Sequence, residues 1–315
     1  MRTVFLGTPE IALPTLRAMA AADGFRPLAV FTQPAARRKR RGKEESSPVG
    51  AEARALGLPV HEVEAVSKGE PLELLRELQP EVVVVVAFGQ ILKKAVLELP
   101  RHGCLNFHPS MLPAYRGAAP VQRAVLEGVV ESGLTVMRLV KKLDAGPILL
   151  QRPWHMSEHK NAEELLEEAG ELGAPMMLEV LAQLDAGIEE RVQDESGVTF
   201  APPLEKTDGV LCFKDSAKML VNRVRAVQPW PRGECRLLDA ERGEVRVLVH
   251  RAEVAENAGS GAPGEVLTIN KQGIVVACGE GAVCLNELQL EGKPRKPARD
   301  VANGLRLKAG ARFKV

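Results

Sequence analysis

The fold is decided by the stretch VVVVVAFG, residues 82–89. Five consecutive valines leave no polar face, which is typical of a strand buried on both faces of a parallel sheet. Outward from it, further strands are predicted by four apolar or β-branched runs: TVFLG (3–7), AVFTQ (29–33), CLNF (104–107) and LTVMRLV (134–140). Helix-like segments lie between them, at residues 11–21, 71–79 and 120–128. Strands that alternate with helices indicate a Rossmann-like, doubly wound, mainly parallel α/β sheet.

The hydrophobic pattern changes in the second half of the chain. Residues 161–185 are charged and helical in spacing, and the polar segment that follows contains Pro202 and Pro203, which is typical of a linker. After a helical stretch at 216–227, short strand-like runs alternate with glycine-rich turns and predict a small OB-like β-barrel. We therefore expect three parts: a catalytic domain at 1–188, a linker at 189–206 and a barrel domain at 207–315.

The length and composition of the chain limit the functions that it can have. The 315 residues suffice for two domains with cores of their own. Only 3% are aromatic, so a nucleic-acid contact would depend on charge and not on base stacking. The net charge of +1 hides an asymmetry, because residues 206–315 hold 19 Lys and Arg against 13 Asp and Glu. Either the smaller domain meets a polyanion or it has an ordinary solvated surface.

The five cysteines include no CxxC pair and are odd in number, which argues against a disulfide framework and a structural zinc site. No stretch is long and apolar enough to cross a bilayer, and the N-terminus begins directly as a strand without a signal segment. We expect a cytoplasmic protein with no membrane partner and no metal.

Candidate chemistry lies in the loops that follow the strands, because open sheets of this kind bind ligands beyond the carboxyl ends of their strands. The first loop, GTPE, has one glycine where a dinucleotide site needs GxGxxG, so a nicotinamide or flavin site is not expected. Asn106 and His108 stand two residues apart and share one side of a strand, with Ser110 close behind. Asp144, in KKLDAGP, can bring a carboxylate to His108.

These residues suit acyl transfer to an amine. Asn106 and His108 would hold the developing oxyanion, and Asp144 would manage the proton that the amine loses. The amine itself attacks, so no Ser or Cys nucleophile is needed. Taken singly, such a side chain is more often structural than catalytic, and only the set of three is strong evidence. Cys104, in an apolar strand without a base beside it, is expected only to pack.

Several strings in the chain resemble methionyl-tRNA formyltransferases. They are VFLGTPE (4–10), VVVVVAFGQILKKAVLELP (82–100), GCLNFHPSMLPAYRGAAPVQRAVLEG (103–128), LDAGPIL (143–149), QPWP (228–231) and KQGIVVACGEGAVCLNELQLEGK (271–293). The resemblance covers almost the whole chain. The part around Asn106 is common to enzymes of this fold that use 10-formyltetrahydrofolate, so it specifies the donor and not the acceptor.

The resemblance implies roles for individual residues. Asn106, His108 and Asp144 would be catalytic. The folate would be bordered by two groups: Phe88, Gly89, Gln90 and Ile91, chiefly through their backbone, and Ser110, Met111, Leu112 and Pro113. Met111 stands where the family usually has Leu, which is a volume-matched exchange.

The acceptor is indicated by two basic features. The loop 35–50 resembles the family's insertion into the tRNA acceptor stem, although its Ala35, Ala36 and Arg37 depart from the usual Asp-Arg-Pro. Its basic residues are Arg37, Arg38, Lys39, Arg40, Arg41 and Lys43, of which Arg40 and Arg41 are preferred as contacts. In the second domain, the candidates are Lys293, Arg295, Lys296 and Arg299, with Lys218, Arg223 and Arg225 as a second group. Without the resemblance, solvated surface would be the ordinary interpretation of either feature.

The resemblance implies formyl transfer from 10-formyltetrahydrofolate to methionyl initiator tRNA, by a monomer. One alternative is a formyltransferase or hydrolase that acts on a small molecule or on water. Another is an RNA-binding module with a vestigial enzyme fold, although phosphate binding alone would not need an imidazole and a carboxylate at the strand ends.

Overall fold

The structure of the protein is a computed structural model that describes residues 1–34, 46–239, 241–256 and 258–315. The contacts divide the chain into two compact units. Unit 1 comprises Met1–Pro120, Glu131–His155 and Leu166–Ala201, and unit 2 comprises Val121–Val130, Met156–Leu165 and Pro202–Val315. No helix in the described part of the chain is both long and apolar enough to span a membrane.

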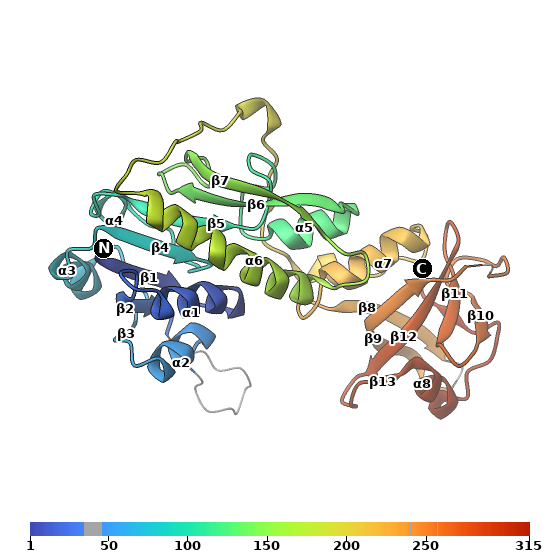
Figure 1. The fold of residues 1–315 in the computed structure, drawn as a ribbon. Coiled ribbons are helices and arrows are strands. Elements are labelled where there is room, and N and C mark those ends of the chain that lie inside the picture. The colour runs from blue at the N-terminus through green and yellow to red at the C-terminus, as the bar shows by residue number, and fades with distance from the viewer. Residues whose placement is uncertain (35–45, 240, 257) are drawn as a thin grey trace. The chain divides into compact units, whose positions relative to one another are not determined.

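Unit 1 contains a mainly parallel sheet in the order β3-β2-β1-β4-β5-β6-β7 (Figure 1). Its strands are β1 (Thr3–Gly7), β2 (Pro27–Thr32), β3 (Val60–Glu62), β4 (Val82–Val86), β5 (Cys104–His108), β6 (Glu131–Arg138) and β7 (Ile148–His155). The first five strands are parallel, whereas β6 runs antiparallel to β5 and β7 antiparallel to β6. The predicted Rossmann-like fold is confirmed, with an antiparallel hairpin at one edge.

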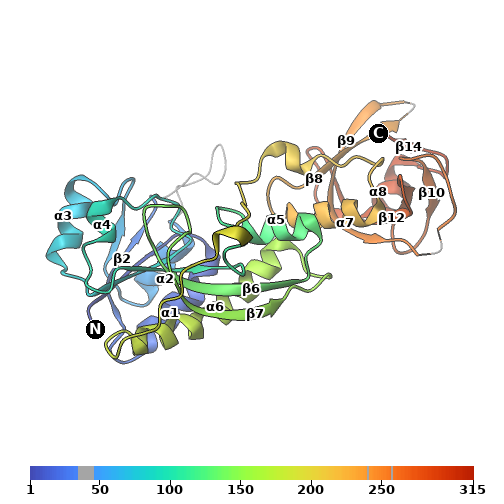
Figure 2. The ribbon, with the colours of Figure 1, turned by 90° about the horizontal axis from the view of Figure 1, so that it is seen from above.

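Helices cover both faces of this sheet because its central strands are apolar on both sides. Figure 2 shows α3 (Gly69–Glu77) and α4 (Lys94–Leu97) on one side, and α1 (Leu13–Ala21) and α6 (Ala162–Gln183) on the other. The apolar residues of α3 and α4 share a core with alternate residues of β1 and β4. On the opposite face α6 approaches closely, because a Cβ on Gly173 would lie 2.4 Å from the ring of Phe107.

The strand order reverses between β1 and β4, which are neighbours although the chain first runs from β1 to β2. Such a switch point leaves a crevice beyond the carboxyl ends of the two strands, where open α/β sheets bind ligands. Thr8 follows β1 there and donates a hydrogen bond to the carbonyl oxygen of Phe88, at 2.9 Å. The stretch after β4 is thereby fixed to the stretch after β1.

Unit 2 contains an antiparallel barrel in the order β10-β11-β12-β9-β8-β14, with β13 paired to β12. The strands are β8 (Gly233–Asp239), β9 (Gly243–Val254), β10 (Val266–Ile269), β11 (Ile274–Ala277), β12 (Ala282–Leu290), β13 (Lys296–Pro297) and β14 (Arg312–Phe313). A bridge between Glu265 and Arg312 nearly closes the barrel. The predicted second barrel domain is thus confirmed in kind, and α7 (Ala217–Ala226) and α8 (Ala298–Leu305) pack against its strands.

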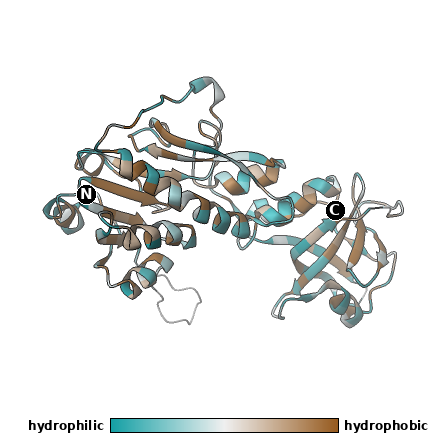
Figure 3. Cartoon of the chain, viewed as in Figure 1, coloured by the Kyte–Doolittle hydropathy of each residue, from teal (hydrophilic) through white to brown (hydrophobic). Residues whose placement is uncertain are grey.

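Hydropathy follows burial in both units. Figure 3 shows hydrophobic residues along the central strands of unit 1, and mixed colours along the barrel strands of unit 2. The remaining elements are short: α2 (Pro48–Ala55), α5 (Pro120–Glu127), and the 3-10 turns η1 (Glu10–Ala12), η2 (Glu195–Gly197) and η3 (Lys206–Gly209). Sequence patterns predicted neither β3 nor β7, nor α2.

Candidate active site

Asn106 and His108 lie on one face of β5, as their spacing predicts. Asn106 is opposite Met137 on β6, so the three side chains share that face. His108 is 4% exposed, and its Nε2 lies 2.9 Å from the carbonyl oxygen of Tyr115. Because a carbonyl oxygen only accepts, this nitrogen carries the hydrogen, and Nδ1 faces away from Tyr115 toward a carboxylate.

That carboxylate belongs to Asp144, whose Oδ2 is 3.9 Å from His108 Nδ1. The same oxygen accepts a hydrogen bond from the Gly117 backbone N–H, at 2.8 Å. The separation from Nδ1 is too long for a hydrogen bond, so Nδ1 has room beside it to meet a ligand atom instead. The backbone at Asp144 is left-handed, with φ of 45°, which is uncommon outside glycine and typical of constrained functional loops.

Asp144 reaches His108 by a different route from the one expected. Since β6 runs antiparallel to β5, its carboxyl end lies beside Leu105, at the far end of β5 from His108. The loop between β6 and β7 then folds back over the face that carries Asn106 and His108. The loop between β6 and β7, and not the end of a parallel strand, therefore brings Asp144 to His108.

The side chain of Asn106 is 9% exposed, and no hydrogen bond joins it to another described residue. The Asn106 amide is not fully enclosed, so it is open to a hydrogen bond with a ligand carbonyl. We regard the Asn106 amide as the clearest sign of a binding position in unit 1.

The expected folate-bordering residues after β4 differ in their surroundings. Phe88 is buried in the core, and its carbonyl oxygen also accepts from Gln33 Nε2 at 3.0 Å. Gly89 has φ of 79°, a conformation that favours glycine. Gln90 binds the backbone of Val63 and Val66, so its side chain holds the loop. Ile91 is 86% exposed and presents an apolar surface at the switch point.

The expected residues after β5 form a braced turn. Ser110 Oγ donates to the carbonyl oxygen of Ala114 at 2.7 Å, and Leu112 is 2% exposed. The Leu112 carbonyl oxygen accepts from Gln151 Nε2 at 2.8 Å, and the Leu112–Pro113 bond is cis. Met111 packs over Gly133, where a Cβ would lie 2.4 Å from the methyl group of Met111. Ser110 and Leu112 are turned inward, and Met111 and Pro113 remain partly exposed.

Two buried residues beside the site were not singled out from sequence. Arg116 is fully buried and Gln193 is 5% exposed. Arg116 Nε and Nη2 both donate to Gln193 Oε1, and Nη2 also donates to Glu195. The one sequence signal was the position of Arg116 inside the string shared with the family; nothing in the polar stretch around Gln193 marks it.

Thiol chemistry at this site is disfavoured. Burial raises the pKa of the Cys104 thiol to about 12, and the free thiols of Cys235, Cys278 and Cys284 are also buried. A thiol with such a pKa carries almost no thiolate at neutral pH, which removes its nucleophilicity. Cys104 therefore packs, as its apolar strand suggests.

The expected tRNA contacts divide into two groups. Arg37, Arg38, Lys39, Arg40, Arg41 and Lys43 lie outside the described residues. On the barrel, Lys293 and Lys296 are exposed and line a groove of about 650 Å³, whereas Arg295 forms an ion pair with Glu287. Within unit 2, Lys218 pairs with Glu158 and Arg223 with Asp215.

Arg225, from the same second group, serves the structure of unit 2. Its guanidinium donates to the carbonyl oxygens of Ser157 and Lys160, and burial lowers its pKa. Among the cationic candidates of the described chain, Lys293, Lys296 and Arg299 are exposed without an ion-pair partner and are thus left open to a polyanion.

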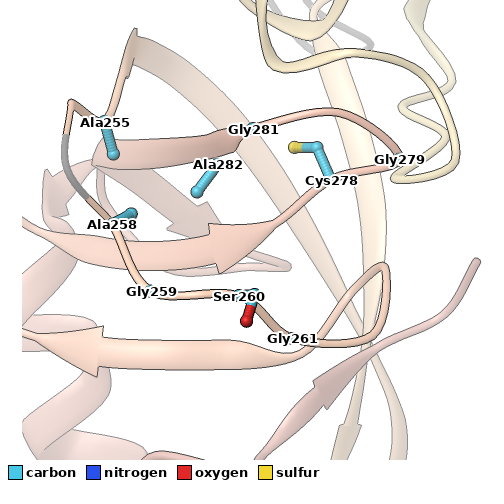
Figure 4. Close-up of a pocket in the computed structure, with 9 residues that line it drawn as sticks. All are labelled: Ala255, Ala258, Gly259, Ser260, Gly261, Cys278, Gly279, Gly281 and Ala282. Atoms are coloured by element: carbon cyan, nitrogen blue, oxygen red, sulfur yellow. The ribbon is translucent and has the colours of Figure 1, made fainter.

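A second pocket of unit 2, of about 390 Å³, is lined by small residues from the barrel (Figure 4). The described residues around it carry no charged side chain, and only Ser260 and Cys278 add a polar side-chain atom. Burial raises the pKa of Cys278 to about 11. This pocket offers no group suited to acyl transfer.

Comparisons with known proteins place this geometry in a family. The formyl transferase model matches residues 1–181, and the model of the formyl transferase C-terminal domain matches residues 203–306. The domain that carries Asn106 and His108 on β5 is thus followed in the chain by a second domain that the same family contains. The chain belongs to the formyl transferase family.

Relatives of similar length carry a more specific name. The chain is 41% identical to a protein of Citrifermentans bemidjiense over 98% of this chain and 95% of that protein, and 42% identical to one of Stenotrophomonas maltophilia over 99% of this chain and the whole of that protein. Both are named methionyl-tRNA formyltransferase.

Solved structures add the fold alone, because their sequence identity is low. HypX from Aquifex aeolicus, solved in complex with tetrahydrofolic acid, is 17% identical with a TM-score of 0.65, over 97% of this chain. The match spans less than half of HypX, 47% of its length. A methionyl-tRNA formyltransferase from Clostridium thermocellum is 14% identical with a TM-score of 0.59, over 82% of this chain and 95% of that one.

Proposed function

We propose that the protein transfers the formyl group of 10-formyltetrahydrofolate to the free amino group of methionyl initiator tRNA, giving N-formylmethionyl-tRNA for translation initiation. The observation that carries the proposal is the meeting of Asn106, His108 and Asp144 on one face of β5. Formyl transfer to an amine requires hydrogen-bond donors for the developing oxyanion, here Asn106 and His108, and a base for the attacking amine, here Asp144. The acceptor is supported by whole-length relatives that bear the name methionyl-tRNA formyltransferase.

In this proposal, the folate supplies the formyl group as an amide on its N10 atom. Asn106 donates its free amide N–H to the formyl oxygen, and His108, with a hydrogen on both ring nitrogens in this proposal, donates from Nδ1 in the space left beside Asp144. Both bonds strengthen as that oxygen becomes an oxyanion, which lowers the barrier. The bond from the amine nitrogen to the formyl carbon forms, and the bond from that carbon to N10 breaks.

In this proposal, Asp144 is the base that accepts the proton of the attacking amine. Its Oδ2 is already held by the Gly117 N–H, which leaves Oδ1 to accept the proton that the attacking amine loses. That proton ends on the leaving N10 atom, so charge and atoms balance.

The surroundings fit a folate at the switch point. Ile91 offers an exposed apolar surface for a ring, and backbone groups of Gly89 and Gln90 lie at the same edge. We assign Phe88, Gly89, Gln90 and Ile91, together with Ser110, Met111, Leu112 and Pro113, to its border. The inward position of Ser110 and Leu112 makes them supports of that border.

We further propose that the protein acts as a cytoplasmic monomer, with residues 1–188 as catalytic domain, 189–206 as linker and 207–315 as tRNA-binding barrel. Lys293, Arg295 and Lys296 would contact phosphates, together with Arg37, Arg38, Lys39, Arg40, Arg41 and Lys43 of the basic loop. The number of phosphates neutralised would set the salt dependence of tRNA binding.

The test is the transfer of labelled formyl from 10-formyltetrahydrofolate to charged initiator methionyl-tRNA. Parallel reactions contain charged elongator methionyl-tRNA, glycinamide ribonucleotide, an amino-sugar nucleotide, or no acceptor. Label on the initiator tRNA alone is the expected result. Label on a small molecule, or formate released without an acceptor, with none on the tRNA, would refute the proposed acceptor.

A further inference from the structure

The side-chain amide of Gln193 uses all of its hydrogen-bonding capacity inside unit 1. Its Oε1 accepts from Arg116 Nε at 3.0 Å and from Nη2 at 2.8 Å. Its Nε2 donates to the carbonyl oxygens of Asp144 at 2.8 Å and Gly146 at 2.7 Å. A buried amide with four partners is rigid, because turning it leaves several polar groups unpaired.

The orientation of this amide is fixed by its neighbours. If oxygen and nitrogen were exchanged, the oxygen would face two carbonyl oxygens and the NH₂ group would face a guanidinium, which only donates. Arg116, fully buried, therefore determines which way the NH₂ group of Gln193 points. It points at the backbone of the loop that carries Asp144.

That loop needs support from outside itself. Asp144 is left-handed, with φ of 45°, and a Cβ on Gly146 would lie 1.7 Å from the carbonyl oxygen of Arg138. Such a backbone costs about 1–3 kcal/mol and persists only where the surroundings over-determine it. Gln193 bonds both carbonyl oxygens of this turn, and the Gly117 N–H bonds the Asp144 carboxylate.

The chain on both sides of Gln193 is anchored to unit 1. Arg191 exchanges two backbone hydrogen bonds with Ile148, at 2.8 and 2.9 Å. Arg116 exchanges two with Thr199 and Ala201, at 2.9 and 2.7 Å. Figure 1 shows the segment after α6 passing beside β7. Gln193 is therefore held in place between two fixed points.

We propose that Gln193 is a positioning residue that, oriented by Arg116, sets the Asp144 carboxylate against His108. The proposal rests on the catalytic role given to Asp144 above. Gln193 touches neither substrate nor the reacting atoms in this scheme. Its loss should lower kcat through displaced Asp144 and leave the binding of both substrates nearly unchanged.

The first experiment compares Gln193→Ala and Gln193→Glu with the control Glu195→Gln. Gln193→Glu keeps the volume and the bonds from Arg116 but presents oxygen to the Asp144 and Gly146 carbonyl groups. We expect kcat to fall about 100-fold in both Gln193 variants, since a shift of about 1 Å at a reacting group costs that much. KM for folate and for tRNA should stay within about twofold.

Glu195→Gln removes the ion pairs of Glu195 with Arg116 and Lys142 but keeps the bonds from Gln193 to the Asp144 and Gly146 carbonyl oxygens. If those bonds hold the Asp144 turn, its kcat should stay within about twofold of wild type. If Gln193→Ala fails to fold, Gln193→Glu still decides the question. Wild-type kcat in the folded Gln193→Glu variant would overturn the proposal.

A double-mutant cycle separates positioning from general destabilisation. Because Gln193 acts through Asp144, adding Gln193→Glu to Asp144→Asn should lower kcat by less than about threefold more. A merely structural role predicts that the two losses multiply. Multiplied losses would therefore contradict the proposal.

Hydrogen exchange at the Gly117 amide gives a readout that needs no activity. Its N–H is bonded to Asp144 Oδ2, so displacement of Asp144 should speed its exchange about tenfold in both Gln193 variants and not in Glu195→Gln. Unchanged protection would overturn the proposal. If the wild-type enzyme formylates no acceptor, the proposed function fails, whereas Gly117 exchange still decides whether Gln193 positions Asp144.

Discussion

The two units place their charged side chains in opposite ways. In unit 1, Arg116 is fully buried and the side chain of Asp144 is 11% exposed, and each is fixed by named hydrogen bonds. In unit 2, Lys293 and Lys296 are exposed beside a groove. Bond-making needs groups fixed to within fractions of an ångström, whereas polyanion binding needs charges free to meet phosphates and is weakened by salt. The difference supports the proposal that unit 1 carries out the transfer and unit 2 binds the tRNA.

The variant His108→Ala gives the strongest test of whether chemistry and tRNA binding lie in different units. We expect kcat for formyl transfer to fall about 10³-fold, because a positioned donor near a developing oxyanion is removed. Dissociation constants for tRNA, measured by filter binding, should stay within about twofold. A variant that lost affinity and turnover in equal measure would show that the units do not divide the labour in this way.

Asn106→Asp should have the next largest effect. It keeps the shape but puts a carboxylate where the oxyanion develops, so kcat should fall about 10²- to 10³-fold. Single-turnover rates with saturating folate measure the loss directly. Asn106→Gln, which retains the amide on a longer arm, serves as the comparison and should lose less. Full activity in Asn106→Asp would exclude Asn106 from oxyanion binding.

Lys293→Ala combined with Lys296→Ala sharpens the barrel side of the comparison. Because the pair removes two cations that would meet phosphates, tRNA binding should weaken about tenfold at low salt, and the slope of log Kd against log salt should fall by about 1.8. Turnover at saturating tRNA should not change. Lys271→Ala, an exposed lysine of the same unit outside the groove, is the control. An unchanged slope would show that this groove does not bind the tRNA.

The smallest effect is expected at an exposed ion pair of unit 1, Arg17 with Glu52 at 2.7 Å. The Arg17 guanidinium holds the pKa of Glu52 below its usual 4.5. Near this pKa, the folded state therefore binds fewer protons than the unfolded state. The ion pair stabilises the folded state above pH 4.5, and this stabilisation is lost as the pH falls through the lowered pKa of Glu52. Arg17→Met should cost at most about 1 kcal/mol in urea unfolding at pH 7.

At a pH below the lowered pKa of Glu52, where both states carry the proton, Arg17→Met and wild type should unfold alike. Arg76→Met, which removes a pair within one helix turn, is a suitable comparison. A difference that persisted undiminished into acid would mean that Arg17 stabilises by packing instead of charge.

Sequence patterns predicted most of the sheet because its central strands are largely apolar. Residues 82–86 are buried on both faces and so carry their own signature, as do the alternating strands of the barrel. Strand β3, Val60–Glu62, is only three residues long and has no apolar run, so its local sequence does not predict a strand. In β7, Arg152, Pro153 and His155 interrupt the apolar run.

The antiparallel orientation of β6 and β7 could in principle have been predicted from the sequence. The nine residues between the two strands are too few for the helical crossover that a parallel pair needs. The pairing of Asn106 with His108 follows from a spacing of two, which is local information. Gln193 meets Asp144 and Arg116 across 49 and 77 residues, and no periodicity encodes such contacts.

The bonds between Arg191 and Ile148, and between Arg116 and Ala201, bear on how this enzyme can be divided. A fragment cut after Gly187 would retain every strand of the sheet and all of α6. It would nevertheless lack the ten or so residues that brace the Asp144 turn. A shortened or transplanted version of this catalytic unit should therefore include the chain up to Ala201, because the residues that support its active site extend well beyond the end of α6.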